Sequence, residues 1–298
     1  MRMRQAGKVV DGLWYLGREE SGIYLMEGSS SSALISGGMS WIVPHVVSQV
    51  KEFQIDLKRI KKLLILHAHF DHLGVVPFFK RLLPDIKIFA SKEALKILNN
   101  EAKLDTINRF SRDTAAEFGQ SSVFGDFDLD WNSEIEINVV AEGDVLELGN
   151  LSLEIIETPG HSFCSISAYS PELKALFPSD SGGIPFKDAI IPSGNANYSM
   201  YQESLAKLNA LEVHYFCADH CGYVTGDEAR QFIKRTITAA QDFRNLVERV
   251  YRRTGSLEKT VKRLVSLAAA ARPDYFLPSS ILESVYREMV RHIAGDLP

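Results

Sequence analysis

The stretch that decides the fold is Leu63-Leu64-Ile65-Leu66-His67-Ala68-His69-Phe70-Asp71-His72. Its first four residues form an apolar run that predicts a short buried strand, and the next six carry three imidazoles and one carboxylate. Side chains that follow a strand end can turn toward one point, and imidazole with carboxylate suits zinc, iron or manganese. The pattern His-x-His-x-Asp-His supplies enough ligands for two ions. We expect a metal site here, because a purely structural role would bury these polar groups at a high desolvation cost.

The composition is that of an ordinary globular protein. The 298 residues are 45% hydrophobic, and the net charge of −5 provides no basic field for nucleic acid or an anionic membrane. No apolar run approaches the roughly 18 residues of a membrane span, and the first residues lack the apolar segment of a signal peptide. The three cysteines suggest no disulfide framework. We therefore expect a cytoplasmic protein with a small-molecule substrate, no nucleic-acid partner and no membrane.

The order of the expected elements indicates two sheets. Strand and helix patterns follow one another along the chain: strands in 13–42, 63–66 and 86–90, a helical insert at about 92–120, and further strands in 135–170. Residues 121–134 are rich in acidic and turn-forming residues, so we expect an exposed loop there. The order fits an α/β (α+β) fold of the αββα type, in which helices cover the outer face of each of two sheets.

The C-terminal part of the chain carries only helical patterns. We expect a sandwich domain over residues 1–225 and a helical appendage over residues 226–298. Two pairs of residues fit the capping box that opens a helix: Thr225 with Glu228, and Ser280 with Glu283. The apolar residues after the second pair form one stripe. The appendage would cover the sandwich, roof the active site or form a homodimer interface.

Three further candidate metal ligands each stand just beyond a short strand-like run: His161, Asp180 and His220. With the first cluster they account for five of the eight histidines in the chain. The other three are expected to be structural: His45, His214 and His292.

This ordered set of seven residues resembles the metallo-β-lactamase superfamily over about residues 10–225. The resemblance implies the αββα fold and two divalent metal ions per chain, zinc or iron, with manganese as a further choice. It implies one ion held by His67, His69 and His161. It implies a second ion held by Asp71, His72 and His220. Asp180 would bridge the two ions.

The sequence departs from the family pattern next to two of these ligands. Ser179 stands where a glycine usually precedes the bridging aspartate, and Ala218-Asp219 replaces the Pro-Gly that usually precedes the last histidine. The bridging aspartate argues against a β-lactam-hydrolysing enzyme. Glyoxalase II and its thioesterase-like relatives remain. Two short stretches are also similar to PqsE-like quinolone-signal response proteins, thioesterase-type members with a helical C-terminus: 84–91 and 274–278.

A two-metal site activates a water molecule by lowering its pKa from 15.7 toward about 7, and it polarises the group under attack. Asp71 is the candidate catalytic residue, which would position the attacking hydroxide as well as bind metal. The sequence therefore predicts a hydrolase acting on an ester or thioester, for instance an acyl-CoA-like compound. One alternative is a small-molecule phosphodiesterase. Another is a regulatory protein that acts through protein contacts of its C-terminal helices.

Overall fold

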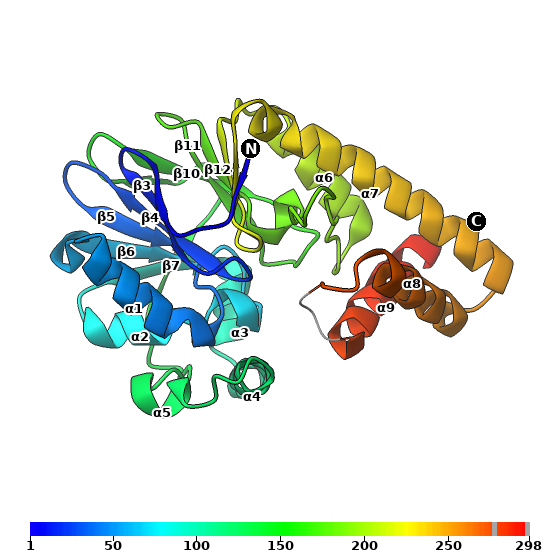
Figure 1. Ribbon diagram of the computed structural model, residues 1–298, viewed down its shortest axis with the longest axis horizontal. Helices are drawn as coiled ribbons and strands as arrows, with labels where there is room; N and C mark the ends of the chain where they lie inside the picture. Colours follow the sequence, from blue (N-terminus) through cyan, green and yellow to red (C-terminus); the bar gives the residue numbers. More distant parts are fainter. Residues whose placement is uncertain (276–278, 296–298) are drawn as a thin grey trace.

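The computed structural model describes residues 1–275 and 279–295, and Figure 1 shows its elements. Two seven-stranded sheets face each other. The first sheet runs in the order β2 (Gly7–Val10), β3 (Leu13–Gly17), β4 (Gly22–Glu27), β5 (Ser32–Ile35), β6 (Ile60–Leu64), β7 (Lys87–Ser91) and β8 (Ile137–Val140). The second runs in the order β1 (Arg2–Met3), β14 (Tyr223–Thr225), β13 (Tyr215–Cys217), β12 (Ala175–Phe177), β11 (Ile166–Ser170), β10 (Ser152–Glu157) and β9 (Val145–Glu147).

Helices flank both sheets. Five belong to the first half of the chain: α1 (Val43–Glu52), α2 (Val76–Leu82), α3 (Lys92–Leu98), α4 (Glu101–Glu117) and α5 (Val123–Phe127). Four follow in the second half: α6 (Tyr198–Leu208), α7 (Gly226–Thr254), α8 (Leu257–Ala271) and α9 (Ser279–Gly295). Figure 1 places α1 and α2 beside the first sheet and α6 with the start of α7 beside the second.

Three apolar clusters hold these layers together. Between the sheets, Tyr24 and Leu64 of the first pack with Leu153 and Phe177 of the second. The other face of the first sheet packs on helices α1 to α4. The other face of the second packs on α6 and the start of α7, and the same cluster continues into α8 and α9. Burial on both faces explains why inner strands such as β4 and β5 read as apolar runs instead of alternating. The αββα prediction is confirmed.

The long helix α7 connects the sandwich to the C-terminal helices. At 29 residues it extends for about 44 Å, given a rise of 1.5 Å per residue. Its first turns pack on the second sheet, as where Phe232 contacts Phe216 of β13, and α8 and α9 pack against its remote half. Within residues 1–275 and 279–295, no helix has both the length and the apolar content that crossing a bilayer requires.

Two local predictions are wrong. Residues 121–134 are not a simple exposed loop, because they contain α5 and bury Phe124 and Trp131 in the core of the first sheet. The Trp131 indole N–H donates to the Leu73 carbonyl at 3.0 Å, which ties this segment to the turn after the histidine cluster. The capping box at Thr225 does not form either. Thr225 is the N-cap residue but makes no side-chain cap bond, and its hydroxyl and amide donate to the Met1 carbonyl instead. Glu228 pairs with Arg2 of β1.

The second expected capping box begins at Ser280, whose side chain lies outside the described residues. The same holds for positions 276–278 of the stretch that is similar to PqsE-like proteins. The division of the chain at residue 225 stays a prediction.

Candidate metal centre

The first four candidate ligands follow β6, which lies between β5 and β7 and runs parallel to both. Beyond its end, the Ile166 amide of the second sheet donates to the Leu66 carbonyl at 2.9 Å. The chain therefore carries His67 and His69 into the junction between the two sheets. A short 3-10 turn, Phe70–His72, then folds Asp71 and His72 back toward them.

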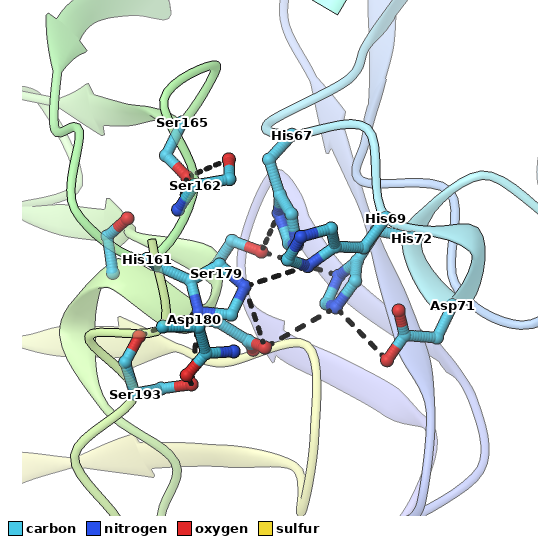
Figure 2. A network of polar contacts seen from close by, with 12 residues as sticks. His67, His69, Asp71, His72, His161, Ser162, Ser165, Ser179, Asp180 and Ser193 are labelled. Atoms are coloured by element: carbon cyan, nitrogen blue, oxygen red, sulfur yellow. Dashed lines mark hydrogen bonds and ion pairs between the residues drawn. The ribbon is translucent and has the colours of Figure 1, made fainter. Parts of the chain in front are cut away.

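The other three candidates come from the second sheet. His161 follows β10 through Gly160, whose backbone passes so close to Tyr201 that a Cβ would lie 2.2 Å from its amide nitrogen. Asp180 lies in the 3-10 turn Ser179–Gly182 after β12, and His220 lies in the loop between β13 and β14. Figure 2 shows His161 and Asp180 facing the histidines of the first sheet.

The seven side chains meet in three overlapping groups: His67, His69 and His161; His67, His72 and Asp180; and Asp71, His72 and His220. Within each group the ligand atoms lie within 4.8 Å of one another. Nδ1 of His69 is 3.0 Å from Nε2 of His161, and Nε2 of His72 is 3.2 Å from Nε2 of His220. Ligand atoms at 2.0–2.2 Å from a tetrahedral ion are themselves roughly 3.3–3.6 Å apart. The spacing therefore fits metal binding.

Asp180 lies at the centre of the constellation. Its Oδ2 is 3.5 Å from Nε2 of His161 and 3.6 Å from Nε2 of His72. Its Oδ1 is 3.9 Å from Nε2 of His220. Oδ2 of this one carboxylate thus lies near a histidine of each expected metal position, and Oδ1 lies near a second histidine of one of them.

The histidine rings are oriented from outside the cluster. Nδ1 of His161 contacts the Ser193 carbonyl at 2.7 Å, and Nδ1 of His220 contacts the Glu20 carbonyl at 2.7 Å. Carbonyl oxygens only accept, so each Nδ1 carries the proton and each Nε2 lone pair is directed into the cluster. Nε2 of His67 is buried without a hydrogen-bond partner. Such an unpaired nitrogen is costly in a protein interior and is what a metal ion would satisfy.

The electrostatics of the cluster favour cation binding. Burial, reinforced by the neighbouring imidazoles, lowers the pKa of His67 well below its ordinary value. Burial and the adjacent His161 lower the pKa of His69 to about 4. Burial alone would raise the pKa of Asp71 and of Asp180, but the nearby imidazoles hold both below the ordinary range. Burial alone would lower the pKa of His72 and of His220, but the nearby Asp71 and Asp180 raise both. At neutral pH the site thus offers two carboxylates together with neutral imidazoles at His67 and His69.

Five of the seven residues border a cavity of about 540 Å³. His69, Asp71, His161, Asp180 and His220 contribute to its lining. The remaining walls come from α4, the loop at 184–195, α8 and α9, and they are mostly apolar. Side chains of the C-terminal helices, such as Val285 and Met289, therefore stand over the candidate metal centre.

Several polar residues around the ligands could not be identified from the sequence. Ser193 orients His161, and Ser36, Ser179 and Asp219 surround His72. The only signal was that Ser179 and Asp219 depart from the family pattern. The three histidines expected to be structural lie outside the three groups, as does Cys221.

Comparison with known proteins agrees with this geometry. The model of the metallo-beta-lactamase superfamily matches residues 17–220, a region that contains all seven candidates. The metallo-beta-lactamase fold-containing protein ST1585 of Sulfurisphaera tokodaii is 25% identical over 220 residues, covering 72% of this chain and 78% of that protein. The hydroxyacylglutathione hydrolase GloC of Haemophilus influenzae is 26% identical over 212 residues, covering 69% of this chain and 88% of that protein.

A solved structure extends the likeness to nearly the whole fold. The metallo-beta-lactamase family protein TTHA1429 from Thermus thermophilus superposes with a TM-score of 0.66 at 17% identity, covering 95% of this chain and 94% of that chain. The chain therefore belongs to the metallo-β-lactamase superfamily.

Proposed function

We propose that the chain is a binuclear metal-dependent hydrolase that cleaves an ester or thioester of a small molecule, such as an acyl-CoA-like compound. The observation that carries the proposal is the convergence of seven candidate ligands, five of which line a mostly apolar cavity of about 540 Å³. A cavity of this size fits within the range that holds small-molecule ligands. The hydroxyacylglutathione hydrolase named above supports a thioester substrate.

The roles of the residues follow from their positions. Two bound ions would polarise the carbonyl group under attack and lower the pKa of a water molecule toward about 7. His67, His69 and His161 would hold one ion, and Asp71, His72 and His220 the other. Asp180 would bridge them, since its two oxygens face different histidines.

Asp71 would also orient the attacking water. Its side chain is 13% exposed and lines the cavity, so it can accept a hydrogen bond from a water molecule there. Because its pKa is held low, Asp71 is a carboxylate at neutral pH and cannot act as a general acid. A leaving group that needs little protonation, such as a thiolate, therefore suits this site better than an amine.

The cavity walls favour a substrate with an apolar part and a negative charge. Apolar side chains of α4, α8 and α9 would contact the acyl group. Among the described residues that line the cavity, Arg272 at the end of α8 is the only lysine or arginine. A carboxylate or phosphate group on the substrate would find its countercharge there.

The regulatory alternative receives less support. It would require the C-terminal helices to keep an apolar face free, but their stripes are buried, as at Val261, Met289 and Val290. Among the described residues, none of the large apolar side chains that are exposed lies on α7, α8 or α9. Dimerisation through these helices and a cytoplasmic location stay predictions.

The test is elemental analysis of protein purified without added metal, followed by assays with thioesters, lactones and phosphodiesters. We expect about two metal ions per chain and hydrolysis of a thioester or ester. The His69→Ala variant should lose metal and activity together, whereas His214→Ala, which changes a histidine outside the cluster, should lose neither. A chain that holds no metal and takes none up would contradict the proposal. Cleavage of phosphodiesters alone would favour the phosphodiesterase.

A further inference from the structure

The two positions at which this chain departs from the family pattern lie in contact. Ser179 and Asp219 are 40 residues apart, yet the Ser179 hydroxyl donates to Oδ2 of Asp219 at 2.5 Å. Both residues are buried, with exposed fractions of 3% and 2%. A serine and a carboxylate thus occupy adjoining places where the family usually has two glycines.

The same Asp219 oxygen receives two further hydrogen bonds. The Ser36 hydroxyl lies 2.9 Å away and Nδ1 of His72 lies 2.8 Å away. A carboxylate can only accept, so His72 must carry its proton on Nδ1, and its Nε2 lone pair is directed to the candidate metal centre. Ser179 also lies 3.2 Å from Nδ1 of His67, so the pair contacts a ligand from each of the two metal positions.

The backbone conformation of the two serines indicates that their hydroxyls are needed. Ser36 and Ser179 have φ angles of 69° and 48°, in the left-handed region that favours glycine. A glycine would take either conformation with less strain. The strain is offset by the hydrogen bonds that each hydroxyl makes to Asp219.

The carboxylate itself is held in place. The Asp219 carbonyl accepts from the Gly22 amide at 2.9 Å, and the Cys221 amide donates to the Glu19 carbonyl at 2.7 Å. The loop that carries Asp219 is therefore fixed to the turn between β3 and β4. A rigid carboxylate can set the orientation of His72 rather than adapt to it.

We propose that Ser179 and Asp219 act as one positioning pair that orients His72 and sets the affinity of the metal position formed by Asp71, His72 and His220. This inference rests on the proposed function only in requiring that the wild-type chain binds two metal ions. It concerns metal affinity and does not depend on the substrate.

The experiment uses the full chain with Zn²⁺ as the probe and measures both dissociation constants by chelator competition. Asp219→Asn, which keeps the shape of the side chain, should weaken the binding of one of the two ions by about 10–100-fold, as expected for a group that orients a ligand. The dissociation constant of the other ion should change by less than about threefold. In a His72→Ala background, Asp219→Asn should have no further effect on the weakened ion.

Ser179→Gly separates positioning from folding. It removes the hydroxyl but relieves the left-handed strain, so the metal-free variant should unfold at the same temperature as wild type or higher. Its zinc affinity should nevertheless fall at the same ion. Gln54→Gly is the matched control, because Gln54 is exposed, has a φ angle of 56° and lies outside the site. The losses in Ser179→Gly and Asp219→Asn should be non-additive when the two are combined.

Each outcome is decisive. Three results would overturn the pairing. One is unchanged zinc affinity in Asp219→Asn, and another is additive losses in the combined variant. The third is a loss of unfolding free energy in metal-free Ser179→Gly as large as its loss of zinc-binding free energy. Wild-type protein that binds two zinc ions but hydrolyses none of the test substrates would refute only the proposed function. Wild-type protein that takes up no zinc would refute both.

Discussion

The ring of Tyr275 packs edge-on against the ring of Phe186, with centroids 5.2 Å apart and planes at 85°. Phe186 follows the turn that carries Asp180, and Tyr275 lies in the segment after α8. Both belong to a small apolar cluster with Ile184, Ile191 and Cys221. This contact holds the segment after α8 against the loop beside the candidate metal centre. It therefore joins the part of the cavity lined by the C-terminal helices to the part that carries the candidate ligands.

Enlarging a wall residue should alter substrate choice without altering the metal. Val285 of α9 is partly buried and lines the cavity. Val285→Phe should lower kcat/KM by about 10-fold or more for the bulkiest acyl thioesters and leave the smallest nearly unaffected. The measurement is a series of thioesters of increasing acyl length, with metal content checked alongside. Val265→Phe is the control, because Val265 lies on α8 and is partly buried outside the cavity. Equal substrate profiles for the two variants would show that these helices have only a structural role.

Asp180 should be sensitive to loss of charge. An asparagine is uncharged and offers one acceptor oxygen instead of two, so Asp180→Asn should hold two cations less well than the carboxylate does. We expect metal affinity or turnover to fall by at least about 10–100-fold, with the fold retained. Elemental analysis and circular dichroism check the two parts of this expectation. A variant with full metal loading and a wild-type rate would exclude the bridging role.

Cys221 should not be a metal ligand, although it adjoins His220. Its side chain packs in the apolar cluster near Tyr275, and burial raises the pKa of the thiol to about 12. It is therefore uncharged at neutral pH, whereas metal binding uses the thiolate. Cys221→Ser should keep both ions, as measured by elemental analysis. Loss of one ion would show that this assignment is wrong.

The contact between β1 and α7 should make a pH-dependent contribution to stability. Arg2 Nε donates to Glu228 at 2.8 Å. Burial alone would raise the pKa of Glu228, but the bond with Arg2 lowers it overall. A carboxylate with a lowered folded-state pKa stabilises the fold above its unfolded pKa, and this contribution is lost as the pH falls through the folded pKa.

Glu228→Gln should therefore lower the free energy of unfolding by about 0.5–1 kcal/mol at neutral pH. The difference from wild type should shrink below the ordinary glutamate pKa of about 4.3. Denaturant unfolding at neutral pH and at a pH below that pKa measures the difference in free energy of unfolding. Asp227→Asn is the control, since the Asp227 side chain is next to Glu228 in the chain and is 93% exposed. A loss of equal size at both pH values would assign the effect to packing.

The fold and the convergence of the candidate ligands could be predicted because their signals are local. Each ligand follows a short apolar run, and the ends of such strands meet where the two sheets join. Residues 121–134 could not be assigned in this way, because Phe124 and Trp131 are separated by acids and turn formers that hide their burial. The capping box failed for a related reason, since Arg2 lies 226 residues before Glu228 in the chain.

The groups that orient the ligands also escaped prediction. Ser193 contacts His161 and Asp219 contacts His72 only through tertiary structure, across 32 and 147 residues of sequence. A serine or aspartate at such a position carries no periodicity of its own. Only the departure from the family pattern indicated that positions 179 and 219 were special.

The candidate ligands are divided between the two sheets: four follow β6, and three follow strands of the second sheet. Ions bound at the junction of the sheets would hold one half of the sandwich against the other, because neither half alone supplies all seven ligands. By mass action, a ligand at 100 times its dissociation constant stabilises the state that binds it by about 2.7 kcal/mol. Chelation should therefore loosen the junction between the halves before it unravels either one.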